Sequence, residues 1–323
     1  MRVDASIAAL RRDRPSQRRL QILAQETRAD WLAKPEVAPV ASALAQYAQG
    51  AALDELPALA RIVSDLESGR DFVSCWVEAG IAALGREPLC QIAHRHSCSP
   101  GLSTMRLLSA GGASLTVLAY EQRPEMAHPA TASFVDREQR ELVLAGKGFV
   151  LFHERVGQSS TDERVRSREL HLLAGRTVSL APLCESRQVL WVEGRMLVLQ
   201  LARSSHNPRP TCEYRLSDGA LVRQASGDKR ASQLEMAMAV LGAMHRRDAV
   251  PAIARHASHG APHLRWDALR HIVALDPVRG VSLLGDIASV EHDPLTAPAR
   301  NLRQDLLARF PQLEAEGNAQ CRS

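Results

Sequence analysis

The segment "ELVLAGKGFVLF" (141–152) indicates the fold class of the central part of the chain. Two short apolar runs, 141–144 and 149–152, flank an Ala-Gly-Lys-Gly sequence. Short runs rich in Val and Leu that are bounded by Gly are typical of β-strands joined by tight turns. The segment therefore predicts two consecutive strands.

Similar runs lie on both sides of this segment. Residues 105–108 and 114–120 flank the turn "AGG" (110–112), which predicts a hairpin. Further runs occur at 169–173, 177–180, 189–192 and 196–201. So many short strands within about 120 residues predict an antiparallel sandwich or barrel.

The segment "LHLLAGRTVSLAPLCESRQVLWVEGRMLVLQL" (170–201) completes a family pattern. Together with 141–152 it resembles the core of the cupin fold, a small jelly-roll barrel. In that family a strand ends in Val-Leu-x-Gly at a tight turn, and a later Ala-Gly begins a strand that runs toward a Pro. The matching residues are Val143, Leu144 and Gly146 for the first feature, and Ala174, Gly175 and Pro182 for the second.

The resemblance also implies where a metal would bind, and most of those ligands are missing. Cupins carry His-x-His and Glu before the first turn, and a further His beyond the Pro. Here His128 is present, but Ala130 replaces the second His. Imidazoles supply the strong donors for Fe(II), Mn(II) or Zn(II), so the segment predicts a cupin-like barrel without the usual metal cofactor. The candidate ligand-binding residues are His128, His153, Glu154, His171, Glu185 and Arg187.

His94 and His96 support an alternative, because they form the one His-x-His in the chain. On a strand over 91–97 this spacing places both imidazoles on one side, as in a metal chelate. With His128, or else His153 or His171, as third ligand and Glu121 or Glu154 as carboxylate, they would form a non-haem Fe(II) site. The other interpretation places both histidines on a polar linker.

Helical periodicity predicts a small four-helix unit before the strands. Apolar residues recur every three to four positions in 16–31, 37–48, 54–66 and 71–83. Ser16 is the expected N-cap of the first helix, and Gly69 the expected end of the third.

Helical periodicity returns after residue 227. The small residues Ala239, Ala268 and Ala299 mark three similar segments, which resemble the helix pairs of HEAT-like repeats. A plain helical bundle is the alternative. Within "HLRWDALRHIV" (263–273), Arg265, Trp266 and Arg270 are the candidate partner-binding residues, since Arg and Trp are favoured at interfaces. Trp266 has an alternative role in a buried contact with the barrel.

The whole chain is therefore expected to be an α+β protein. The predicted division is a helical domain at 1–90, a cupin-like antiparallel β-barrel at 91–226, HEAT-like repeats at 227–313 and a tail at 314–323. With 45% hydrophobic and 24% charged residues, the composition is typical of globular proteins rather than disordered ones. No run approaches the roughly 20 apolar residues of a membrane helix. The charged N-terminal segment does not resemble an export signal, so a cytoplasmic location is expected.

Two functions remain open at this stage. The first is a binding protein whose barrel holds a small molecule or peptide, with the C-terminal helices engaging a protein partner. The second is an iron-dependent, cupin-type oxygenase in a peptide or natural-product pathway. A third, lower-ranked possibility uses the arginines, which make up 37 of the 40 basic residues and favour carboxylate and phosphate partners. Nucleic acid is not the expected partner, because aromatic residues are absent from the basic cluster near the N-terminus.

Overall fold

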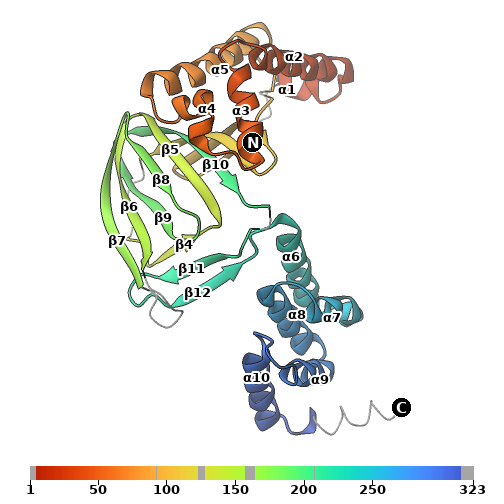
Figure 1. Ribbon diagram of the computed structural model, residues 1–323. Coiled ribbons are helices and arrows are strands. Elements are labelled where there is room, and N and C mark those ends of the chain that lie inside the picture. Colours follow the sequence, from red (N-terminus) through yellow and green to blue (C-terminus); the bar gives the residue numbers. More distant parts are fainter. Residues whose placement is uncertain (1–4, 92, 123–127, 157–163, 207, 314–323) are drawn as a thin grey trace. The chain divides into compact units, whose positions relative to one another are not determined.

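The computed structural model describes residues 5–91, 93–122, 128–156, 164–206 and 208–313 (Figure 1). It divides into two compact units, residues 1–206 with 213–222 and residues 207–212 with 223–323. The first unit begins with helices and continues as antiparallel strands. Its helices are α1 (Ala5–Leu10), α2 (Arg14–Leu32), α3 (Ala38–Ala48), η1 (Leu53–Glu55), α4 (Pro57–Ile62) and α5 (Leu66–Arg86).

The described strands form three sheets. The largest has the order β1-β2-β3-β10-β5-β8, the second β7-β6-β9, and the third β12-β11-β4. Their bounds are β1 (Arg95–Ser99), β2 (Leu102–Ala110), β3 (Ala113–Glu121), β4 (Thr131–Phe134), β5 (Arg137–Ala145), β6 (Lys147–Val156), β7 (Arg164–Leu173), β8 (Thr177–Leu180), β9 (Glu185–Val192), β10 (Arg195–Ser204), β11 (Thr211–Arg215) and β12 (Leu221–Ala225).

Strands β5 and β10 lie in the middle of the largest sheet and are buried on both faces. On one face, Leu142 of β5 and Leu199 of β10 join a core shared with the helices. On the other face, Val143 and Val198 join a second core shared with β6, β7 and β9. A strand covered on both sides needs apolar residues at successive positions, which explains the unbroken runs in the sequence.

The strands form an open sandwich, which is one of the two architectures that the sequence predicted, and the β-barrel expected at 91–226 is not closed. Among the described strands, no pairing joins the edge strands β1 and β8 of the largest sheet into a ring. The chain instead passes between the two main sheets at glycines with positive φ. Gly146 (φ +80) links β5 to β6, and Gly175 (φ +86) lies between β7 and β8. A Cβ at Gly146 would lie 2.2 Å from the carbonyl oxygen of Arg195, so this turn requires glycine.

The strand predictions identify most of the central elements but not their full lengths. The hairpin around Gly111 is confirmed as β2 and β3, and the segment 177–180 is confirmed as β8. Strands β4, β11 and β12 were not predicted. The predicted strand at 91–97 begins later, at Arg95.

The helices pack on the outer face of the largest sheet (Figure 1), where Trp31, Leu44 and Leu59 contact the core that contains Leu199. Asp13 rather than Ser16 caps α2, because its side chain accepts a hydrogen bond from the Ser16 backbone N–H. The predicted end of a helix at Gly69 is also wrong. Asp65 caps α5, and Gly69 lies inside that helix.

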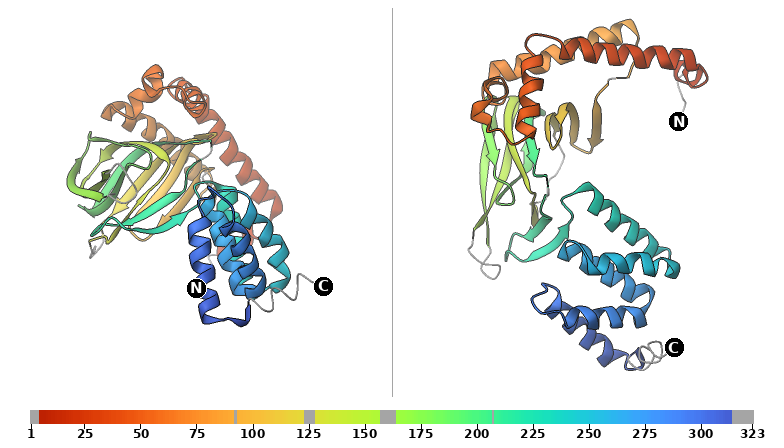
Figure 2. Two further views of the ribbon diagram at one scale, coloured as in Figure 1. Left: turned by 60° about the horizontal axis from the view of Figure 1, so that its bottom comes forward. Right: turned by 45° about the vertical axis from the view of Figure 1, so that its right-hand side comes forward.

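The second unit consists of helices that follow one another in space (Figure 2). Met238, Leu269 and Leu284 belong to its hydrophobic core. Asp228 and Asp276 accept hydrogen bonds from backbone N–H groups and so cap α6 and α9. The helices are α6 (Lys229–Ala243), η2 (Arg247–Ala249), α7 (Val250–Ser258), α8 (Pro262–Leu275), α9 (Pro277–Ala288) and α10 (Thr296–Arg309). Their assignment to HEAT-like repeats stays a prediction.

Among the described residues, none of the helices has the length and apolarity that crossing a bilayer requires.

Candidate functional site

A buried polar cluster interrupts the core between the two main sheets. Its central pair is Arg187 of β9 and Glu141 of β5, whose side chains are 6% and 2% exposed. The Arg187 Nε donates a hydrogen bond to Glu141 Oε2, and its Nη2 donates to the Tyr120 hydroxyl at 3.0 Å. Gln200 Nε2 donates to the other carboxylate oxygen of Glu141 at 2.7 Å. Four strands thus contribute to one network, and the Glu141 carboxylate is bound on both oxygens.

The alternation of side chains along each strand produces this cluster. Glu141 and Val143 share one face of β5, and Gln200 and Val198 share one face of β10. Gln200 lies directly opposite Glu141 in the register of the two strands. Polar residues at the positions where the apolar pattern breaks are therefore brought together inside the sandwich.

The Glu141 carboxylate stabilises the charged form of Arg187. Burial by itself would lower the pKa of the Arg187 guanidinium, but the adjacent Glu141 charge and hydrogen bonds raise that pKa above its usual value. Burial raises the pKa of the Tyr120 phenol, although Arg187 opposes this. Arg187 therefore stays charged and Tyr120 stays protonated at neutral pH.

This cluster borders a hollow of about 280 Å³ between β3 and β9, which we call the Tyr120 hollow. Tyr120 and Arg187 provide its polar side, and Leu102 and Val189 provide apolar wall. Trp191, which is 38% exposed, also lines it and contacts the ring of Phe149. The full lining is Gly101, Leu102, Tyr120, Glu121, Arg187, Gln188, Val189, Trp191 and Val192.

The Tyr120 hydroxyl can serve a ligand in this hollow. It accepts the Arg187 hydrogen bond, so its own proton remains available for donation to an acceptor. The Arg187 charge is balanced by Glu141, and the Glu121 carboxylate of the lining is paired with Arg195, which leaves the polar side of the hollow close to neutral. A ligand with an apolar ring and an uncharged acceptor fits this chemistry.

His153, a predicted ligand-binding residue, is instead a fully satisfied buried side chain. Its ring is 0% exposed, with Nδ1 2.8 Å from Ser167 Oγ and Nε2 2.8 Å from Gln188 Oε1. Gln188 Nε2 donates to the Thr131 carbonyl oxygen, which assigns Oε1 as the acceptor for His153 Nε2–H. Burial lowers the pKa of His153, so the ring is neutral. It contacts the hollow only indirectly, through Gln188.

Of the other predicted ligand-binding residues, only Arg187 lines the Tyr120 hollow. His171 is exposed and makes an edge contact with Phe149, at 4.1 Å between ring centroids. Glu185 accepts a hydrogen bond from the Ala181 backbone N–H, while Glu154 and His128 are exposed.

Sequence reasoning missed Tyr120, Glu141 as a buried partner, and Gln200. The polar positions within otherwise apolar strands were the signal for the last two.

The structure does not bring His94, His96 and His128 together. His94 is buried, its Nε2 lies 2.9 Å from the Leu107 carbonyl oxygen, and its ring contacts Trp76. His96 and His128 are exposed. Within the described part of the chain, no three His, Cys, Asp or Glu side chains are grouped as metal ligands. The polar groups of the cluster inside the sandwich are a guanidinium, a phenol hydroxyl, an amide and one carboxylate already bound by Arg187, so this set does not fit the iron that the alternative prediction requires.

The predicted partner-binding residues differ in exposure. Arg265 pairs with Asp293 through two hydrogen bonds, and its side chain is 12% exposed. Trp266 packs against the core of the helical unit. Only Arg270 is exposed.

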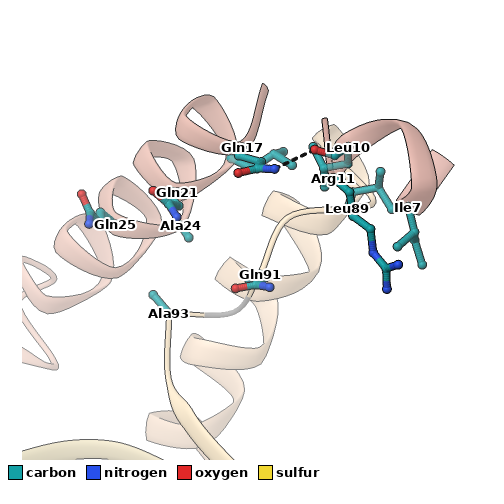
Figure 3. Close-up of a pocket in the computed structure, with 11 residues that line it drawn as sticks. Ile7, Leu10, Arg11, Gln17, Gln21, Ala24, Gln25, Leu89, Gln91 and Ala93 are labelled. Carbon is teal, nitrogen blue, oxygen red and sulfur yellow. Dashed lines mark hydrogen bonds between the residues drawn. The ribbon is translucent and has the colours of Figure 1, made fainter. Parts of the chain in front are cut away.

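A second cavity, of about 470 Å³, lies between α1, α2 and residues 89–93 (Figure 3). Ile7, Leu10 and Leu89 contribute apolar side chains, and Gln17 donates a hydrogen bond to the Leu10 carbonyl oxygen. This cavity contains no buried charged group, which distinguishes it from the Tyr120 hollow.

Comparison with known proteins gives no family assignment. No family model matches the chain, and no curated protein matches it. Several solved structures match about a third of it. They include a putative mannose-6-phosphate isomerase from Ralstonia eutropha JMP134 (14% identity, 33% of this chain and 88% of that chain, TM-score 0.24). KdgF from Halomonas sp. (15%, 35% and 89%, 0.25) and the CENP-C cupin domain of Drosophila melanogaster (10%, 34% and 74%, 0.27) are two more. Because these identities and TM-scores are low, the architecture described above rests on the strand pairing alone.

Proposed function

We propose that the sandwich is a cupin-like binding domain that holds a small molecule in the Tyr120 hollow without a metal cofactor. The turns at Gly146 and Gly175, which the sequence pattern singled out, support the cupin-like assignment because both have positive φ and both lie where the chain changes sheet. The observation that carries the binding function is the buried Tyr120–Arg187–Glu141 network at the edge of an apolar hollow. A preorganised polar group beside apolar walls is typical of ligand sites.

The expected ligand is uncharged, with an aromatic or apolar ring and a hydrogen-bond acceptor. Leu102, Val189 and Trp191 offer contact area to the ring, and Tyr120 O–H offers a donor to the acceptor. A charged ligand is disfavoured because the Arg187 charge is already neutralised by Glu141. In this proposal the helical unit supplies the partner-binding region, with Arg270 as the exposed one of the three candidate residues.

The test uses benzamide, which has an uncharged ring and a carbonyl acceptor, in an NMR titration of the full chain. We expect it to shift the Trp191 indole and the Leu102 and Val189 methyl signals, while the Trp266 indole signal stays in place. Tyr120→Phe removes the donor while keeping the ring, so the affinity is expected to fall roughly threefold to tenfold, as for the loss of one hydrogen bond.

Two outcomes would contradict the proposal. In one, benzamide shifts Trp266 as strongly as Trp191, which indicates unspecific binding. In the other, Tyr120→Phe leaves the affinity unchanged, so that the hydroxyl plays no part in recognition.

A further inference from the structure

A cavity of about 550 Å³ lies between α2, the segment around His94 and strand β2. We call it the arginine cavity, because Arg28 of α2, Arg95 of β1 and Arg106 of β2 all line it. It shares no lining residue with the Tyr120 hollow. Its lining is Gln25, Arg28, Ala29, Leu32, Ala93, His94, Arg95, Arg106, Leu107, Leu108 and Ser109.

The charges of the arginine cavity are unbalanced. Three guanidinium groups line it, and the lining includes no carboxylate. Within the described residues, no hydrogen bond or ion pair is found for any of these three side chains. Arg95 and Arg106 are also directly opposite each other in the antiparallel pairing of β1 and β2. Like charges at opposed positions of neighbouring strands destabilise a sheet, so this arrangement has a cost that a bound anion would offset.

His94 also lies at the arginine cavity and is sensitive to its charge. It lines the arginine cavity, is 8% exposed, and its Nδ1 has no hydrogen-bond partner among the described residues. Its ring is held in place by the Leu107 carbonyl oxygen on one side and by Trp31 and Trp76 on the other. Because Nε2 donates to the Leu107 carbonyl oxygen, Nδ1 is the acceptor nitrogen of a neutral imidazole, and the charge of Arg28 acts on this ring.

The geometry points to a phosphate-binding site: we propose that the arginine cavity binds the phosphate group of a small ligand. Guanidinium groups form paired, charge-assisted hydrogen bonds with phosphate oxygens. A phosphate dianion offers enough oxygens for Arg28, Arg95 and Arg106 at once, whereas a single carboxylate has only two. The volume exceeds that of one phosphate, which leaves room for the remainder of the ligand.

The state of His94 provides a spectroscopic readout. Burial, followed by the charge of Arg28, lowers the pKa of His94 to about 4. An anion bound beside Arg28 offsets that charge and raises the pKa of His94. The imidazole resonances of His94 should therefore titrate at higher pH in the presence of phosphate.

The experiment titrates the full chain with inorganic phosphate at constant ionic strength and follows affinity by calorimetry and stability by thermal unfolding. Arg28→Gln, Arg95→Gln and Arg106→Gln are expected to weaken phosphate binding about tenfold or more each, since each removes one charge-assisted contact. Arg18→Gln is the matched control, because Arg18 is an exposed arginine on the same helix as Arg28.

A second expectation separates binding from folding. Without phosphate, Arg95→Gln and Arg106→Gln should unfold at the same temperature as the unchanged chain or at a higher one, since each removes the opposed like charge. With phosphate, both should lose the stabilisation that the unchanged chain gains.

Three results would overturn the proposal. They are a phosphate affinity that does not differ between these variants and Arg18→Gln, an acetate titration that stabilises the chain as well as phosphate does, and binding seen with a DNA oligonucleotide but not with inorganic phosphate. None of these results bears on benzamide binding, so the two proposals fail separately.

Discussion

At the residue scale, buried histidines in this protein differ in how their nitrogens are satisfied. His153 has a partner for each ring nitrogen, whereas His94 has a partner for one only. Both have lowered pKa values because burial disfavours the imidazolium. Neither ring is an exposed ligand-binding group, although the sequence alone suggested such a role for each.

The lowered pKa of His94 predicts a specific loss of stability in acid. The folded-state pKa is about 4 and the ordinary value is 6.5, so the unfolded chain binds the proton more readily between these pH values. The contribution of His94 is therefore complete above pH 6.5 and declines as the pH falls toward 4, by about 3 kcal/mol in total. His94→Gln should show a shallower decline in the free energy of unfolding, measured in urea across this range.

The neighbouring exposed His96 provides the control for this measurement. His96→Gln should leave the pH dependence as it is in the unchanged chain. Identical pH profiles for His94→Gln and the unchanged chain would contradict the assignment of His94 as a buried, neutral imidazole.

The Arg187–Glu141 pair predicts a strong asymmetry between single and double substitutions. Arg187→Met leaves the Glu141 charge buried without its cation, which is expected to cost about 3–5 kcal/mol in the free energy of unfolding. Adding Glu141→Leu should restore most of that loss. Lys147→Met breaks the exposed pair with Glu193 and should cost about 0–1 kcal/mol. Chemical denaturation of the four proteins checks this, and an equally small effect of Arg187→Met would show that Glu141 is solvated.

At the element scale, α5 packs closely at Gly69 against the end of α4 and against side chains of β5. An added Cβ at Gly69 would be 2.7 Å from the Ile62 carbonyl oxygen of α4 and 2.8 Å from Leu142 Cδ2 of β5. Arg70 Nε donates a hydrogen bond to the Leu144 carbonyl oxygen at 2.8 Å, one residue further along the helix. Glycine inside this helix therefore serves packing, and it does not end the helix.

Two glycines of α5 predict opposite responses to the same substitution. Gly69→Ala should destabilise the chain by roughly 1–3 kcal/mol, because the methyl group overpacks the contact with Ile62 and Leu142. Gly80→Ala should stabilise it by up to about 1 kcal/mol, because nothing lies within 4 Å and alanine is the better helix former. Thermal unfolding checks both, and a stabilising Gly69→Ala would show that α5 does not approach β5 so closely.

At the scale of the whole molecule, each of the two compact units has hydrophobic core residues of its own. Leu199 is fully buried in the unit that contains the sandwich, and Leu269 is fully buried in the helical unit. Because each unit has its own core, we expect two transitions in a calorimetric scan.

Leu199→Ala and Leu269→Ala should each lower only one of these transitions, with a cost of about 2–5 kcal/mol for the cavity created. If both substitutions shift one common transition by the same amount, the two units unfold as a single cooperative system.

Sequence patterns predicted the features that depend on local interactions and missed those that depend on contacts between distant residues. Central strands such as β5 and β10 were predictable because burial on both faces produces uninterrupted apolar runs. Strands β4 and β11 were not predictable, because neither TASF nor TCEYR contains the Val, Leu or Ile that marks the short strand β8 (TVSL). Gly69 was assigned to a helix end because local chemistry favours glycine there, whereas contacts with Leu142, remote in sequence, explain its place inside α5.

The sequence by itself determined the α+β class, the succession of a helical, a β and a second helical segment, and the turns at Gly146 and Gly175, because hydrophobic period and backbone conformation are local properties. Only the tertiary structure decided which polar residues meet. Tyr120, Glu141, Arg187 and Gln200 come from four strands, and Arg28, Arg95 and Arg106 come from one helix and two strands. Their proximity depends on strand pairing and on the packing of α2, which are long-range contacts that no local pattern in the chain records.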